Sequence, residues 1–195
     1  MHVDTPRRGF TMIELIVVLA IAGILLGLAA PRLSDYLLVQ RLKGIHSQLV
    51  TDLQFGRSEA VAKNIAARFV FRSDDATTCY TMFTVPPGSD PSLRCDCLLG
   101  AGAACSGGAA ELRTHAVPRS NGVRFAIADG VDPAFAIDHM SGRLLAIPTT
   151  ADPSPLTAFV VETVIDGGRA LRTTIGQAGR VTSCGTIATL GAPPC

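Results

Sequence analysis

Hydrophobic and polar positions along the chain follow three regimes. From Phe10 to Ala30 the residues are apolar, with Thr11 and Glu14 as the distinctly polar exceptions. Over 31–63 apolar residues recur at spacings of three, four and seven, which predicts an amphipathic helix. Over 64–195 short runs rich in β-branched and aromatic residues alternate with Gly-, Pro- and Asp-containing turns, which predicts strands. One long helix therefore precedes a β-rich head.

The second half of the predicted helix has one apolar face. Its members are Leu38, Leu42, Ile45, Leu49, Leu53 and Ala60. Charged residues occupy the other faces, and we expect most of them to be solvated: Arg32, Asp35, Arg41, Lys43, Asp52, Arg57, Glu59 and Lys63. We expect this half of the helix to be buried along one side against the head.

Nine strands are predicted in the head, at 66–72, 79–85, 111–117, 123–128, 134–138, 143–148, 157–166, 169–176 and 179–184. Met140-Ser141-Gly142 predicts a hairpin turn between the fifth and sixth strands, and Asp166-Gly167-Gly168 predicts another between the seventh and eighth. A long helix followed by many short strands predicts an α+β fold, with the helix packed on an antiparallel β-sheet head.

The apolar run Phe10–Ala30 would form a helix about 30 Å long, which matches the hydrocarbon core of a bilayer. Arg7 and Arg8 precede the run, and no Lys or Arg follows until Arg32. The positive-inside rule then places the N-terminus in the cytoplasm and the head outside. A lone carboxylate such as Glu14 costs a few kcal/mol inside a membrane and marks a functional residue with a partner.

Two simpler interpretations of this segment stay open on the residues alone. An ordinary signal peptide would end near Ala29 and Ala30, but its apolar stretch is normally shorter and lacks an acid. Pro31, directly after these alanines, is also a poor start for a mature chain. The second interpretation is a plain membrane anchor in which the glutamate has no function.

Cysteine usage indicates an oxidising compartment. All six cysteines follow the apolar run, and an even number behind a membrane segment predicts disulfides. Six cysteines allow fifteen pairings, which the sequence does not decide. We favour Cys184 with Cys195, because this bond would close a short C-terminal loop that has little else to hold it. The Gly- and Ala-rich stretch 95–110, which holds three cysteines, predicts an irregular loop stapled by a disulfide.

Catalytic and metal-binding patterns are weak. The glycines of GAGAACSGG lack the strand–turn–helix setting of a nucleotide-binding loop. A zinc site would have to use Cys95, Cys97, Cys105 and His115, at a spacing unlike that of Cys-x2-Cys knuckles. A nucleophilic set would have to combine Ser58, His139 and Asp129, which no spacing supports. We expect isolated structural or surface roles for His46 and His139, and we expect no enzyme, metal or cofactor.

Gly9-Phe10-Thr11-Met12-Ile13-Glu14 closely resembles the prepilin leader motif of type IV pilins and type II secretion pseudopilins. The resemblance implies cleavage by a prepilin peptidase between Gly9 and Phe10, and methylation of the new amine of Phe10. Glu14 would become the fifth residue of the processed chain and would pair with the N-terminal amine of a neighbouring subunit, which sets the register of a filament. Such a partner removes most of the desolvation penalty of the acid. Pro31 matches a helix-bending proline of many pilins.

A narrower resemblance is to the GspH/FimT group of minor pseudopilins and minor pilins. It rests on Leu53, Arg57, Ser58, Glu59 and Ala60, and on Gly179-Arg180-Val181 followed by Cys184. It implies a minor pseudopilin of the type II secretion system, with a minor pilin of a type IV pilus as the alternative. The implied segments are a leader over 1–9, a transmembrane and filament-core helix over 10–30, the amphipathic half over 31–63 and the head over 64–195. The implied partners are other pseudopilins or pilins, the prepilin peptidase and the bacterial inner membrane, with the head in the periplasm.

Nucleic acid is the weaker expectation for a partner. Some FimT-type minor pilins are associated with DNA uptake through a Gly-Arg-x-Arg motif, but here Thr182 stands in place of the second arginine. Arg169, Arg172 and Arg180 would form at most a small basic patch with weak, salt-sensitive affinity for phosphates. Over 64–195, ten Lys and Arg against eleven Asp and Glu leave a net charge of −1. A secreted binding domain with an ordinary signal peptide is a more distant alternative.

Overall fold

The long helix is present in the computed structural model, which describes residues 9, 11–147, 155–165 and 167–195, and leaves out the side chains of 28–31 and 189. The helix α1 spans Met12–Lys63, close to the predicted range. The chain divides into two compact units, Met1–Leu37 and Leu38–Cys195. The second half of α1, from Leu38 on, therefore belongs to the same compact unit as the strands of the head.

Nine strands are described in the head, and each overlaps a predicted one. They are β1 (Ala67–Ser73), β2 (Thr77–Thr84), β3 (Ala110–Pro118), β4 (Val123–Ala126), β5 (Ala134–Ile137), β6 (Leu144–Leu145), β7 (Ala158–Ile165), β8 (Arg169–Gly176) and β9 (Val181–Gly185). Three single-turn 3₁₀ helices accompany them: η1 (Cys97–Leu99), η2 (Arg119–Asn121) and η3 (Ala188–Leu190).

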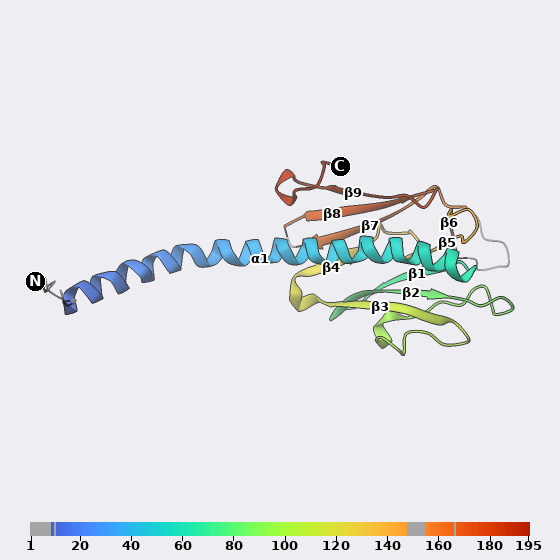
Figure 1. Cartoon of the computed structure of the whole chain (residues 1–195), viewed down its shortest axis with the longest axis horizontal. Coiled ribbons are helices and arrows are strands. Elements are labelled where there is room, and N and C mark those ends of the chain that lie inside the picture. Colours follow the sequence, from blue (N-terminus) through green and yellow to red (C-terminus); the bar gives the residue numbers. More distant parts are fainter. Residues whose placement is uncertain (1–8, 10, 148–154, 166) are drawn as a thin grey trace, which may run out of the picture. The chain divides into compact units, whose positions relative to one another are not determined.

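The strands form two antiparallel sheets. One has the order β3-β2-β1-β5-β6 and the other the order β4-β7-β8-β9. β5 pairs with β6 and β7 pairs with β8, so both predicted hairpins are present, although Asp166 lies outside the described residues. Within the head, the second half of α1 runs along the two sheets, with β1–β3 on one side and β7–β9 on the other (Figure 1). The predicted α+β class is confirmed.

The apolar face of α1 packs into the head as predicted. Leu42, Leu49, Leu53 and Ala60 are fully buried, and Leu38 and Ile45 are partly buried against the same core. A fully buried leucine contributes about 1.5–3 kcal/mol, several times the helix propensity difference between ordinary residues. Packing, and not local propensity, therefore holds this half of the helix.

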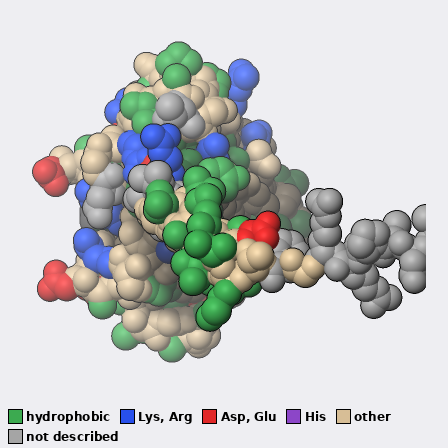
Figure 2. Space-filling view, turned by 90° about the vertical axis from the view of Figure 1, so that its left-hand side faces the viewer, with side chains coloured by type: hydrophobic (Ala, Val, Ile, Leu, Met, Phe, Trp, Pro, Cys, Tyr) green, Lys and Arg blue, Asp and Glu red, His purple; other side chains and the backbone are tan. Residues whose placement is uncertain are grey.

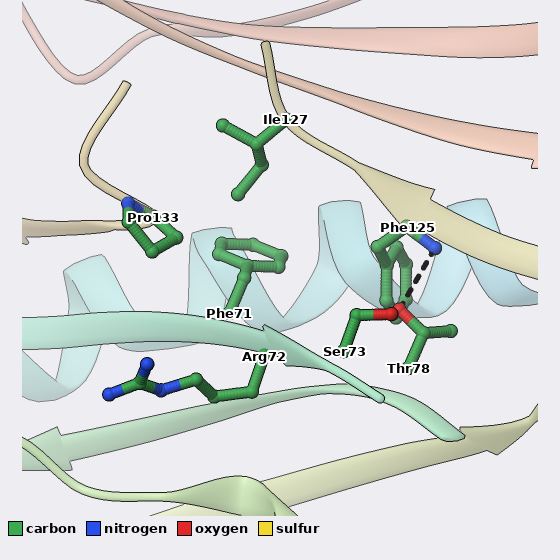
Figure 3. A pocket seen from close by; sticks show the side chains of 7 residues that line it. All are labelled: Phe71, Arg72, Ser73, Thr78, Phe125, Ile127 and Pro133. Atoms are coloured by element: carbon green, nitrogen blue, oxygen red, sulfur yellow. Dashed lines mark hydrogen bonds between the residues drawn. The ribbon is translucent and has the colours of Figure 1, made fainter. Parts of the chain in front are cut away.

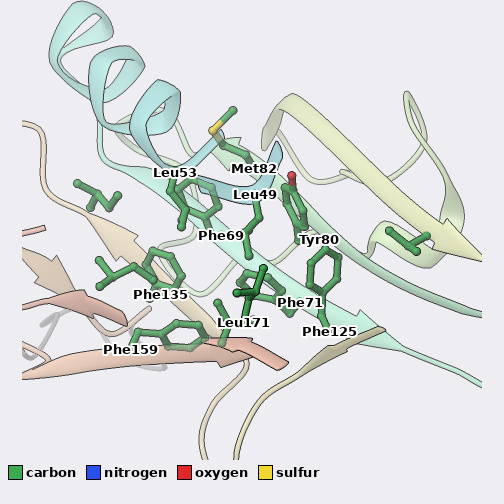
Figure 4. Close-up of a cluster of buried hydrophobic side chains, with 14 of the residues drawn as sticks. Leu49, Leu53, Phe69, Phe71, Tyr80, Met82, Phe125, Phe135, Phe159 and Leu171 are labelled. Atoms are coloured by element: carbon green, nitrogen blue, oxygen red, sulfur yellow. The ribbon is translucent and has the colours of Figure 1, made fainter. Parts of the chain in front are cut away.

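Aromatic side chains join the two sheets beneath the helix. Phe159 of β7 lies between Phe71 of β1 and Phe135 of β5, with ring centroids 5.8 Å and 4.6 Å away (Figure 4). Tyr80 and Phe125 extend the cluster at a centroid distance of 5.4 Å. Such pairs add to the stabilisation from buried area, so the two sheets and the helix share one core.

The helix lies close to the sheet at Gly56. A Cβ atom placed there would lie 2.5 Å from Cζ of Phe69 and 2.7 Å from Sδ of Met82. One residue on, the Arg57 guanidinium covers Gly142, where a Cβ would meet Nη2 at 2.9 Å. With Ala60 fully buried, the Gly-Arg-Ser-Glu-Ala stretch of the sequence has a packing role where the helix ends.

Three disulfides staple the head. They join Cys79 to Cys97, Cys95 to Cys105, and Cys184 to Cys195. The third is the pair favoured from the sequence, and the first two tie the Gly- and Ala-rich loop to β2 and to itself. No cysteine is free, so none offers the thiolate that a zinc site at this loop would need.

Candidate functional site

The first compact unit presents an apolar helix with no covering of its own. Among the described residues of its first three turns, Met12 is 83% exposed, Ile13 71% and Leu19 63%. Exposed aliphatic side chains continue on all sides of the helix to Leu26, at 70%. Figure 2 shows hydrophobic side chains gathered at this end of the chain. A helix that is hydrophobic all round is a surface for lipid or for other helices.

Thr11 and Glu14 organise the start of α1. The Thr11 hydroxyl accepts a hydrogen bond from the Glu14 backbone N–H at 3.3 Å, and the Thr11 carbonyl accepts one from Leu15 at 3.2 Å. Thr11 therefore caps the helix, and Glu14 occupies the position of the acid in a capping box. An acid in the first turn also interacts favourably with the helix dipole. Local helix chemistry accounts for Glu14 in part, and its functional role is a separate question.

Several predicted positions lie outside the described residues. Phe10 and residues 1–8 are among them, and so is the side chain of Pro31. Cleavage after Gly9, methylation of Phe10 and the kink at Pro31 therefore stay predictions. By length and hydropathy no single described helix qualifies as a membrane span, whereas the bent pair Met12–Gly27 and Arg32–Lys63 does so jointly, on length and composition alone.

Asp52 is a correction to the predicted solvated face of the helix. Its side chain is fully buried and accepts hydrogen bonds from the Tyr80 hydroxyl at 2.6 Å and from Nε2 of Gln48 at 3.0 Å. Arg113 Nη1 also donates to it in an ion pair, and the Arg113 guanidinium stacks over Phe55, 4.9 Å from the ring centroid. Burial and the bond to Asp52 raise the pKa of Tyr80. The period of the apolar face would have found Asp52, because it lies three residues after Leu49.

His46 is also inside the head. Its Nε2 lies 3.1 Å from the Ser183 hydroxyl, and its Nδ1 lies 3.4 Å from the Thr173 hydroxyl. Burial lowers the pKa of the imidazole. The two hydroxyls come from β8 and β9, so His46 ties the helix to the second sheet and has the structural role expected for it.

No described hydrogen bond or ion pair joins Ser58, His139 and Asp129, the nucleophilic set considered from the sequence. The Ser58 hydroxyl donates to the Phe55 carbonyl of its own helix at 2.7 Å, and His139 lies 3.5 Å from the Asp138 carboxylate. Within the described part of the chain, no group of three or more metal-ligating side chains is found.

The three candidate arginines do not gather into one patch. Arg172 forms an ion pair with Glu162 at 2.8 Å. Arg169 begins β8, whereas Arg180 follows the turn at the other end of that strand, a separation of about 20 Å at the rise of a β-strand. Gly179 beside Arg180 has a structural role, since its φ is +68° and a Cβ there would lie 2.2 Å from the Gly142 carbonyl oxygen.

Comparison with known proteins identifies the N-terminal segment. Residues 5–30 match a family model described as the prokaryotic N-terminal methylation motif, which confirms that this end of the chain is type IV pilin-like. No curated protein matches the chain in sequence.

Two solved structures are similar to the chain at low identity. The crystal structure of the type IV minor pilin FimU from Pseudomonas aeruginosa has a TM-score of 0.45 and 21% identity, over 73% of this chain and 87% of that one. The minor pseudopilin EpsH from the type 2 secretion system of Vibrio cholerae has a TM-score of 0.42 and 15% identity, over 73% of this chain and 95% of that one. At these TM-scores neither similarity identifies the fold or function of this chain.

Proposed function

We propose that the chain is a minor pseudopilin of the type II secretion system, made as a prepilin and assembled into a pseudopilus. The observation that carries this proposal is the exposed apolar helix of residues 12–27, which begins inside the methylation motif. The role is mechanical and not catalytic. The helix holds the subunit in the inner membrane and then packs among the helices of a filament, and the disulfide-stapled head makes contacts outside that bundle.

Processing creates the partner that Glu14 requires. A cut after Gly9 frees the amine of Phe10, and prepilin peptidase methylates it. The basic pair Arg7 and Arg8 keeps the leader in the cytoplasm by the positive-inside rule, so the head lies in the periplasm, where disulfides form. In the filament the Glu14 carboxylate pairs with the amine of a neighbouring subunit, because an unpaired charge in apolar surroundings is strongly destabilising.

Mass spectrometry of the N-terminus tests the processing step. The chain, expressed with a prepilin peptidase, is expected to begin at a methylated Phe10, and a peptidase-free host is expected to leave the leader in place. A mature chain that begins near Pro31 would indicate an ordinary signal peptide and would overturn the proposal.

Three substitutions of Glu14 separate registration from helix capping. Glu14→Gln retains most of the side chain but loses the charge, Glu14→Asp retains the charge, and Glu14→Ala loses both. If Glu14 sets the register, all three variants should be processed normally. The Glu14→Gln and Glu14→Ala variants should then lose incorporation into filaments, and the Glu14→Asp variant should partly retain it. The Thr11 hydroxyl accepts its hydrogen bond from the Glu14 backbone N–H, so the Glu14→Ala variant retains this bond. Full incorporation of the Gln variant would exclude a role for the charge.

A minor pilin of a type IV pilus is the second candidate, because both systems use the same leader. The Gly179-Arg180-Val181-Thr182 stretch lacks the second arginine of the DNA-uptake motif, which favours secretion. Deletion of the gene distinguishes the two. Loss of exoprotein secretion with normal surface pili supports the pseudopilin, and loss of surface pili with normal secretion supports the pilin.

A further inference from the structure

A small cavity opens beside the end of β1. It has a volume of about 250 Å³, below the range of about 300–1,000 Å³ that is usual for small-molecule sites. Its apolar lining consists of Phe71, Phe125, Ile127 and Pro133, and its polar lining of Arg72, Ser73 and Thr78 (Figure 3). Its size and lining suit a single apolar side chain and not a cofactor.

The cavity lies where β1 loses its neighbouring strand. β5 pairs with β1 as far as Ala134 opposite Val70, and one last bond runs from the Phe71 N–H to the Pro133 carbonyl at 2.8 Å. Pro133 has no N–H to return to the Phe71 carbonyl. Alternate residues of an antiparallel strand direct both backbone groups to the same side, so Phe71 and Ser73 present an open edge toward the cavity.

Side-chain contacts hold the walls of the cavity in place. On one side, the Arg94 guanidinium binds both carboxylate oxygens of Asp132 at 2.6 Å, directly before Pro133. On the other side, the Phe125 N–H donates to the Thr78 hydroxyl at 3.1 Å (Figure 3), so a side chain and not a strand caps this edge of β4. The open edge of β1 is therefore bounded by fixed walls and does not depend on closure of a loop.

Two arginines, Arg72 and Arg119, flank this end of β1. Arg72 is exposed, and no described carboxylate forms an ion pair with it. Arg119 donates to the Ser73 hydroxyl at 2.9 Å. The nearby acid Asp74 accepts the N–H groups of residues 76 and 77 with one carboxylate oxygen, and Asp75 follows it at the tip of the hairpin. Arg72 and Phe71 point to opposite sides of β1 (Figure 3).

We propose that this cavity binds an extended segment of a partner protein that carries an apolar residue directly next to an acidic one. The segment pairs with the backbone of Phe71 and Ser73 as an added strand. Successive side chains of a strand point to opposite faces, so an apolar residue that enters the cavity places its acidic neighbour on the face of Arg72. The added strand supplies affinity, and the cavity and the guanidinium supply specificity.

Peptide binding to the full-length chain in detergent tests this proposal. The probe is a fluorescently labelled Thr-Glu-Phe-Glu-Thr peptide with blocked ends. Its binding is measured by fluorescence anisotropy. Thr-Lys-Phe-Lys-Thr and Thr-Glu-Gly-Glu-Thr serve as controls for charge and for the apolar side chain. We expect saturable binding of the first peptide, with severalfold weaker binding of both controls. Equal binding of the lysine peptide, or no binding of the glutamate peptide, would overturn the proposal.

Two protein variants test the two halves of the site. Ser73→Pro removes the open N–H at an edge position where proline is tolerated, and Ser73→Ala is its matched control. The Ser73→Pro variant should lose binding of the glutamate peptide, and the Ser73→Ala variant should retain it. Arg72→Glu should weaken binding of the glutamate peptide by about fivefold, as for an exposed ion pair. The same substitution should strengthen binding of the lysine peptide. If the Ser73→Pro variant fails to fold, the wild-type chain is tested instead with a glutamate peptide that is N-methylated at its three central residues. Unchanged binding of this probe would exclude an added strand.

The site goes beyond the proposed filament role and does not depend on it. All residues that form it lie in the unit Leu38–Cys195, and the assay requires neither processing nor assembly. Failure of peptide binding would therefore leave the pseudopilin proposal intact, and an unprocessed N-terminus would leave this binding site intact.

Discussion

The same substitution at two glycines of one helix should have different effects on stability. Gly44 and Gly56 both lie inside α1, where replacement by alanine gains about 1 kcal/mol of helix propensity. Outside the neighbouring backbone of the helix, no atom lies within 4 Å of a Cβ placed at Gly44, whereas a Cβ at Gly56 would lie 2.5 Å from Phe69 and 2.7 Å from Met82. Extra methyl groups in a packed core typically cost about 1–3 kcal/mol. Gly44→Ala should therefore stabilise the head, and Gly56→Ala should be less stable than Gly44→Ala by about 1–3 kcal/mol.

Thermal unfolding of the processed chain in detergent measures this difference. The chain has no Trp, so the near-ultraviolet circular dichroism of buried Tyr80 reports on the core. For a chain of this size, 1 kcal/mol corresponds to about 2–4 °C in Tm. We expect Gly44→Ala to melt about 2–4 °C above the wild type and Gly56→Ala to melt below Gly44→Ala by a similar or larger margin. Equal Tm values for the two variants would show that the helix does not approach β1 as closely as the structure indicates.

Three further predictions concern the interior of the head. Asp52→Ala should cost about 2–3 kcal/mol of unfolding free energy. Loss of a buried ion pair costs about 3–5 kcal/mol, but the cost is smaller here because the Arg113 side chain is 43% exposed and regains water. Urea denaturation measures the cost. An unchanged free energy of unfolding would exclude a structural role for Asp52. The pKa of His46 is lowered by burial from 6.5, so the unfolded chain takes up the proton first and stability should fall as pH drops below about 6.5. His46→Gln should make this decline of stability with falling pH shallower in urea titrations between pH 7 and 5, where His115 still contributes to it. An unchanged dependence of stability on pH would contradict this prediction. Replacing Cys184 and Cys195 together by Ser removes an 11-residue closure and should cost about 2–3 kcal/mol, which thermal unfolding detects; an unchanged Tm would show that the backbone bonds of Gly185 hold the C-terminus alone.

Periodicity predicted the helix, whereas runs rich in β-branched and aromatic residues between turn residues predicted the strands of the head. The run around Phe69 and Phe71, and the turns at Gly142 and Gly167, carry this information locally. The favoured bond between Cys184 and Cys195 followed in the same way from a short loop closure. Each of these features depends on residues close together in the sequence.

Features that depend on distant residues could not be predicted. The order β3-β2-β1-β5-β6 brings Pro133 beside Phe71, and no local pattern marks the cavity that results. Asp52 was assigned to solvent as a charged residue. Its spacing from Leu49 would have placed it on the buried face, but its partners Tyr80 and Arg113 come from strands that lie far along the chain. The pairing of Cys79 with Cys97 likewise follows from the position of the loop against β2.

The two halves of α1 contain similar aliphatic residues but belong to different compact units. Leu42, Leu49 and Leu53 are buried in the head, whereas Ile13 and Leu26 are exposed. Effects of residues that share no contacts are additive, so Glu14 variants should leave the Tm of the head unchanged while they alter filament incorporation. The proposed move of the subunit from lipid into a helical bundle requires this independence, because the head would have to remain folded in both surroundings. A Glu14→Gln variant with a lowered Tm would show that the halves are coupled, and its assembly defect would then reflect stability and not registration.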